Sequence, residues 1–161
     1  MAPKIVYHGT WESTAPHEHG YPFHAGTLRA ADDRLEDEVS HGVDWSEVGR
    51  GVSSIHAYEI SDNAPTSRRT WQDPMFGEDE NQLVPEHKEN RIYPYKNDRE
   101  DRGSTSYVIP SHFVGKHVKH LGVQFQQLVN PYDGRDTDVF NAMSTMLGGK
   151  REWWLVTDGY C

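Results

Sequence analysis

The sequence has few of the features that mark secreted, membrane-bound or nucleic-acid-binding proteins. Its single cysteine, Cys161, is the last residue, which excludes an internal disulfide framework and a multi-cysteine zinc site. No apolar run approaches the roughly 18–20 residues that span a bilayer, and the first residues lack the apolar core of a signal peptide. Basic side chains are also few, 16 against 25 acidic ones, and the formal net charge of −9 disfavours phosphate binding. We therefore expect a cytoplasmic domain that binds neither membrane nor nucleic acid.

The sequence is rich in aromatic residues and in histidine. Apolar residues make up only 35% of the 161 positions, but five Trp, eight Tyr and five Phe can fill a core, which excludes a disordered acidic chain. This length predicts a single domain spanning residues 1–161. The ten histidines have no explanation in composition alone.

Hydrophobic periodicity predicts an α+β domain with more strand than helix. Alternation and short apolar runs predict strands at 4–8, 21–25, 53–60, 106–110, within 113–129 and at 152–157. The strand at 53–60 is expected to be half-buried. Helices are expected at 28–40, with Thr27 as N-cap and an apolar stripe of Leu28, Ala31, Leu35 and Val39, and from Asp136 or Asp138 to Leu147. A long polar connection occupies residues 61–89.

The first motif that could carry chemistry is Tyr7-His8-Gly9-Thr10, at the end of the first strand. Histidine there can present one ring nitrogen to a ligand, and glycine lets the backbone approach it closely. A strand-end histidine followed by a turn glycine is the purely structural alternative.

A second motif follows 15 residues later, where Phe23-His24-Ala25 leads into Gly26-Thr27-Leu28-Arg29-Ala30-Ala31. Together the two motifs resemble the front half of the ADP-ribosyltransferase fold, shared by diphtheria-toxin-like enzymes, poly-ADP-ribose polymerases and rifampin-modifying transferases. The resemblance covers roughly the first 40 residues. It implies two small antiparallel sheets that form a split cleft, with a few flanking helices.

The same resemblance implies a site for NAD, which is a substrate in this family. His8 would bond a ribose hydroxyl, the backbone of Gly9 would hold the nicotinamide amide, and the hydroxyl of Thr10 would lie close behind. An aromatic ring would stack on nicotinamide, a role for Phe23 or for Tyr21 on the same side of the strand. Thr27, at the helix start, completes the expected cofactor-binding set.

The family also has an acidic residue that stabilises the positive charge developing as nicotinamide leaves. Aligning Tyr107-Val108-Ile109 with the family's strand puts Ser106 at that position, and serine cannot supply a negative charge. The nearest carboxylates precede the strand, so Glu100 is our first candidate and Asp101 our second. With His8 they form the predicted catalytic set. The alternative is a solvated loop in which these acids pair with Arg99 and Arg102.

The resemblance thus predicts an NAD-dependent mono-ADP-ribosyltransferase. The acidic surface favours a protein acceptor over nucleic acid, and small members of this fold suggest a phage or bacterial effector, acting in the host cytoplasm if phage-encoded. One alternative is a catalytically inactive module on the same fold that binds a nucleotide or a protein. A second is a metal site at His17, His19 and His24, although this spacing does not match a known zinc motif.

Overall fold

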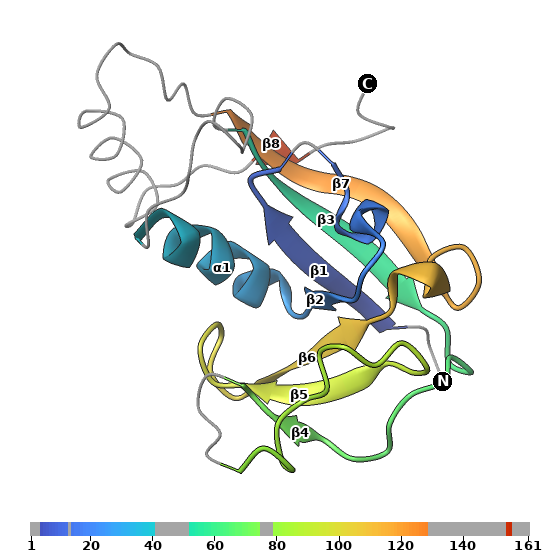
Figure 1. Cartoon of the computed structure of the whole chain (residues 1–161). Coiled ribbons are helices and arrows are strands. Elements are labelled where there is room, and N and C mark those ends of the chain that lie inside the picture. Colours follow the sequence, from blue (N-terminus) through green and yellow to red (C-terminus); the bar gives the residue numbers. More distant parts are fainter. Residues whose placement is uncertain (1–3, 13, 41–51, 75–78, 129–153, 156–161) are drawn as a thin grey trace.

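The computed structural model describes residues 4–12, 14–40, 52–74, 79–128 and 154–155, and Figure 1 shows how they are arranged. The described elements form two β-sheets with one α-helix beside them. Their order is β1 (Lys4–Thr10), the 3-10 helix η1 (Pro16–His19), β2 (Phe23–Ala25), α1 (Leu28–Ser40), β3 (Val52–Ile60), β4 (Trp71–Gln72), β5 (Tyr93–Asn97), β6 (Ser104–Ile109), the 3-10 helix η2 (Ser111–Phe113), β7 (Val118–Leu128) and β8 (Trp154–Leu155). This confirms the predicted α+β class and its two small, mostly antiparallel sheets.

The first sheet has the order β1-β3-β7-β8, and all its pairs are antiparallel. The long strand β3 lies at its centre, with His8 of β1 directly opposite His56. The expectation that this strand is half-buried is wrong, because Ile55 and Ala57 are as fully buried as His56 and Tyr58. A central strand is covered on both faces when a helix packs on one of them and a second sheet on the other.

The second sheet has the order β2-β6-β5-β4, with β4 and β5 parallel and the other pairs antiparallel. It meets the first sheet where Tyr7 of β1 and Gly26 exchange two backbone hydrogen bonds of 2.7 and 2.9 Å. The predicted connection at 61–89 contains the two-residue strand β4, and β5 was not predicted at all. One apolar core fills the space between the sheets, with Val6, Phe23, Tyr58, Tyr107, Ile109 and Phe113 among its members.

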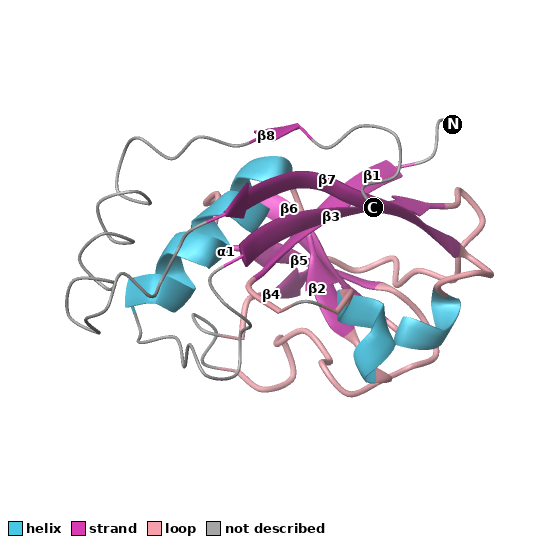
Figure 2. Ribbon diagram, turned by 90° about the horizontal axis from the view of Figure 1, so that it is seen from above, coloured by secondary structure: helices cyan, strands magenta, loops and turns pink. Residues whose placement is uncertain are grey.

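Helix α1 has the predicted bounds, and Thr27 is its N-cap because its Oγ1 accepts the Ala30 N–H at 3.0 Å. The stripe prediction holds at Ala31 and Leu35, which are buried, but not at Leu28, whose first-turn side chain is exposed. Figure 2 shows α1 at one end of the strands and the two 3-10 helices at the other.

The glycine of the first motif is required by this packing. A Cβ at Gly9 would lie 2.3 Å from the backbone oxygen of Ala31, so only glycine lets α1 approach β1 this closely. None of the helices in the described ranges is long and apolar enough to cross a bilayer. The predicted helix ending at Leu147 lies outside the described residues.

Candidate functional site

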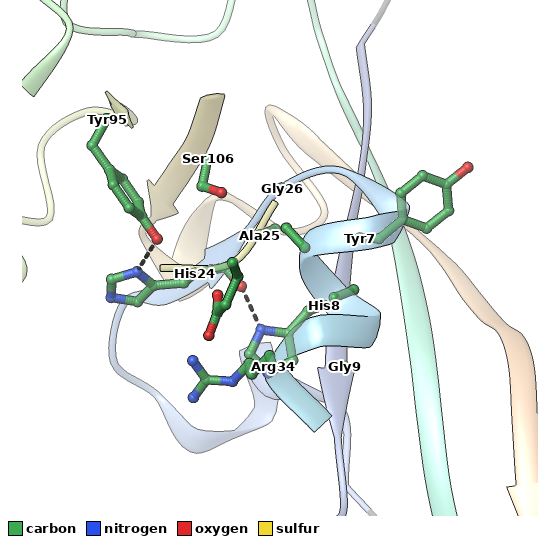
Figure 3. A pocket seen from close by; sticks show the side chains of 12 residues that line it. Tyr7, His8, Gly9, His24, Ala25, Gly26, Arg34, Tyr95 and Ser106 are labelled. Carbon is green, nitrogen blue, oxygen red and sulfur yellow. Dashed lines mark hydrogen bonds between the residues drawn. The ribbon is translucent and has the colours of Figure 1, made fainter. Parts of the chain in front are cut away.

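A small pocket opens where the two sheets meet, next to α1, and holds about 240 Å³ of space continuous with solvent. Figure 3 shows it from close by. Side chains reach it from β1, β2, α1, β5, β6 and the loop after β5. Its lining residues are Tyr7, His8, Gly9, His24, Ala25, Gly26, Ala30, Ala31, Arg34, Tyr95, Glu100 and Ser106. The part enclosed by the protein is only about 10 Å³, room for one water molecule and far below the range of about 300–1,000 Å³ common for ligand sites, so a larger ligand would bind at the open mouth of the pocket.

His8 is held in a single tautomer at the wall of this pocket. Its Nδ1 contacts the backbone oxygen of His24, and a carbonyl can only accept, so Nδ1 carries the proton. The Nε2 atom therefore has a lone pair and can accept a hydrogen bond. Burial, with the positive charge of Arg34 as a second cause, lowers the pKa of His8 to about 3. The imidazole is thus neutral at physiological pH.

Glu100 lines the same pocket and is positioned by Asn97, the last residue of β5. The buried Asn97 side chain accepts the backbone N–H of Glu100 at 2.8 Å and that of Arg99 at 3.1 Å. Its amide nitrogen also lies 3.4 Å from the Glu100 carboxylate. A neutral histidine acceptor and a carboxylate, our first two candidate catalytic groups, therefore meet at one pocket.

Asp101, the second candidate acid, faces a different way. Its backbone has a φ of 49°, and its carboxylate accepts the Thr27 hydroxyl at 2.6 Å. Its own N–H donates to the carboxylate of Asp33 at 2.9 Å. Asp101 and Thr27 fasten the loop to the start of α1, and neither residue lines the pocket. Asp101 and Thr27 therefore stabilise the fold at this position.

The three other expected cofactor-binding side chains are also placed away from the pocket. Phe23 is 5% exposed and packs in the core against Tyr58, with ring centroids 4.8 Å apart. Tyr21 is 62% exposed and stacks on His19. Thr10 is buried, and its hydroxyl accepts the Glu12 N–H at 3.0 Å in a turn. Side chains alternate along β2, so burying Phe23 in the core turns the neighbouring His24 side chain to the pocket instead.

Sequence reasoning missed a hydrogen-bonded group at this pocket, which we call the pocket cluster: His8, His24, Tyr95 and Glu86. The Tyr95 hydroxyl lies 2.8 Å from Nδ1 of His24, and the Glu86 carboxylate lies 3.0 Å from Nε2 of the same ring. Tyr95 was overlooked because β5 was not predicted. The two tyrosines on either side of Pro94, Tyr93 and Tyr95, were the signal that could have revealed this strand.

A second group, the sheet cluster, consists of His17, His56, His120 and Tyr58. Nδ1 of His17 lies 2.9 Å from the Tyr58 hydroxyl, and Nδ1 of His56 lies 3.0 Å from Nε2 of His120. Burial lowers the pKa of all three histidines, that of His56 to about 4, where His120 adds to the effect. The rings pack directly on one another: His17 meets His120 edge-on, and His56 stacks on His120.

The expected metal set is not brought together. His17 contacts Tyr58, His19 contacts Glu12, and His24 lies in the pocket cluster. Across the described parts of the chain, no three histidine, cysteine or acidic side chains are grouped as metal ligands.

No family model matches the chain, and neither a curated protein nor a solved structure was found to match it. The geometry of the pocket is therefore the basis for a functional assignment.

Proposed function

We propose that this protein is an NAD-dependent mono-ADP-ribosyltransferase that transfers ADP-ribose to a macromolecular acceptor, a protein in preference to nucleic acid. One observation carries the proposal: His8 and Glu100, predicted from the sequence to be 92 positions apart in one site, line the same pocket between the two sheets. The resemblance of the first 40 residues to ADP-ribosyltransferases supports it.

In this proposal His8 positions NAD through Nε2, which accepts a hydrogen bond from a ribose hydroxyl. The low pKa of His8, caused chiefly by burial, matters here because the nicotinamide ring is positively charged. A protonated imidazole would repel that charge, whereas a neutral one binds the hydroxyl without repulsion. The nicotinamide riboside end would lie at the open mouth of the pocket, and the adenylate end would extend beyond it.

Glu100 supplies the negative charge for the reaction. As the bond between nicotinamide and C1′ of the ribose breaks, its electron pair leaves with nicotinamide, which becomes neutral, and positive charge develops on the sugar. A fixed carboxylate stabilises that charge most strongly when the surrounding protein holds it in place before the reaction. Asn97 provides this restraint through its hydrogen bonds to the loop.

The test is nicotinamide release from NAD, measured by chromatography, together with transfer of label from NAD to proteins of a cell lysate. We expect Glu100→Gln to reduce both by about 10²–10³-fold, the usual effect of losing one transition-state contact. Asp98→Asn is the matched control, because Asp98 lies in the same loop but does not line the pocket. Equal loss in both variants, or none in Glu100→Gln, would contradict the role of Glu100.

Ser106, which carries no charge where the family has an acid, favours one other function: a catalytically inactive module that binds a nucleotide or a protein. In that case NAD would bind, as measured by calorimetry, without nicotinamide release. If NAD neither binds nor reacts, the pocket is not an NAD site, and only protein binding is left of the two proposals.

A further inference from the structure

The pocket cluster contains a directed chain of hydrogen bonds from a phenol to a carboxylate. The pKa of Glu86 is lowered, chiefly by its hydrogen bond with His24, so the carboxylate is ionised and can only accept. Nε2 of His24 must then carry the ring proton and donate to it, at 3.0 Å. Nδ1 is left as an acceptor, and the Tyr95 hydroxyl donates to it at 2.8 Å.

The chain is held at its middle residue, His24, and at its phenol end, Tyr95. The backbone oxygen of His24 accepts Nδ1–H of His8, so His24 also orients His8, the residue proposed to bind NAD. At the phenol end Ser106 hydrogen-bonds with Tyr95 and itself accepts the Asn97 amide at 3.0 Å. A Cβ on Gly26 would lie 2.3 Å from the Ser106 hydroxyl, so glycine at that position keeps this arrangement possible.

We propose that Tyr95, His24 and Glu86 form a proton relay that activates the acceptor, and that the acceptor is a neutral hydroxyl group. This rests on the function proposed above. The acceptor oxygen forms a bond to C1′ of the ribose as the bond to nicotinamide breaks. Its proton passes to the Tyr95 oxygen, and the Tyr95 proton passes to Nδ1 of His24. The imidazolium so formed is stabilised by the Glu86 carboxylate, and the one proton released by the reaction ends on His24.

Tyr95 needs the relay because it does not ionise by itself. Burial, with the negative charges of Glu100 and Asp73, raises the pKa of its phenol above the ordinary value. It can therefore accept a proton only while it gives its own proton to His24, in the manner of a hydroxyl paired with a histidine and an acid.

The charges around the relay indicate the class of acceptor. A carboxylate acceptor arrives without a proton and needs no base, and it would be repelled by Glu86 and Glu100. A neutral hydroxyl needs a base and meets no such repulsion. The charged and titratable groups that face the relay are His8 from β1, Arg34 from α1, Asp73 after β4, His87 beside Glu86, and Glu100 after β5.

The first experiment is chemical rescue of Tyr95→Phe. With NAD and a simple alcohol or water as acceptor, we expect this variant to form product at least about 10²-fold more slowly than the unmodified protein. 3-Acetylpyridine is a neutral nucleophile without a proton to lose, so it should restore the rate of nicotinamide release and give the 3-acetylpyridine analogue of NAD. Tyr93→Phe is the control, because Tyr93 lies on the same strand, is equally buried and bonds Asn90 instead.

The second experiment separates a relay role of Glu86 from a structural one. If Glu86 stabilises the imidazolium, Glu86→Gln lowers the rate on the plateau and moves the acid limb of the pH–rate profile to lower pH. A structural role would lower the rate without moving the limb. Unchanged limbs, a Tyr95→Phe rate within threefold of the unmodified protein, or failure of 3-acetylpyridine to rescue would overturn the relay while leaving nicotinamide release intact. Absence of nicotinamide release from the unmodified protein would overturn the proposed function, and the relay with it.

Discussion

Within the described ranges, two clusters contain a histidine that hydrogen-bonds a buried tyrosine, and they differ in the next partner of that histidine. In the pocket cluster the distance between His24 and the Tyr95 hydroxyl is 2.8 Å, and in the sheet cluster the distance between His17 and the Tyr58 hydroxyl is 2.9 Å. The bonds are alike. What differs is the next partner: Glu86 for His24, and the neighbouring ring of His120 for His17.

This comparison shows that a histidine–tyrosine pair is not by itself a site. An imidazole can take up a proton during a reaction only if a negative charge stabilises the product, and Glu86 provides that charge. In the sheet cluster a proton would meet two other imidazoles, and burial outweighs the nearby carboxylate of Glu18, so the pKa values of its histidines are lowered. In the proposed relay His24 of the pocket cluster takes up a proton during the reaction, whereas the histidines of the sheet cluster stay neutral.

The same substitution in each cluster should have effects of very different size. His24→Gln interrupts the proposed relay, so we expect nicotinamide release to fall by at least about 10²-fold. His120→Gln removes one ring of the sheet cluster and should leave the rate within about twofold, because His120 does not line the pocket. The test is the steady-state rate of nicotinamide release by both purified variants, each checked for folding by circular dichroism. Equal losses would show that the two clusters are coupled.

The sheet cluster should instead control stability in acid. An unfolded histidine takes up a proton near pH 6.5, whereas His56 in the folded protein does so only at about pH 4. Between these values the unfolded state binds more protons, so the free energy of unfolding falls as the pH decreases. For His56 the full loss is about 3 kcal/mol. The groups facing it are His8, His17, Glu18 and His120.

Urea unfolding at pH 7, 6, 5 and 4 measures this effect. In His56→Gln the fall of unfolding free energy between pH 6.5 and 4 should be smaller than in the unmodified protein, whatever its stability at pH 7. His112→Gln is the control, since His112 is exposed on η2 and its loss should leave the slope unchanged. A slope unchanged in His56→Gln would mean that His56 does not resist protonation.

Local patterns in the sequence were sufficient for those parts of the fold that depend on nearby residues. Helix α1 could be predicted to its ends, because the Thr27 cap and the apolar spacing at Ala31 and Leu35 are local signals. Strand β5 was missed, since Pro94, Lys96 and Asn97 weaken the strand signal of Tyr93 and Tyr95. The burial of both faces of β3 also depends on distant partners, β1 and β7, that no local pattern specifies.

The site residues also include some that the sequence could predict and others that depend on packing. His8 and Glu100 could be selected from motif order, and the structure brings both to one pocket. Phe23 could not be recognised as a core residue, because its orientation depends on how β2 pairs with β6. His24, Tyr95 and Glu86 come from three separate segments, and only the packing of the second sheet brings them together.

The most direct test of the central claim, that the pocket between the sheets takes NAD, is a titration of the protein with NAD followed by NMR of the histidine rings. We predict that the resonances of His8 and His24 shift as NAD is added and saturate together, while those of His56 and His120 in the sheet cluster do not move. Shifts confined to the sheet cluster, or no shift in any ring, would contradict the account.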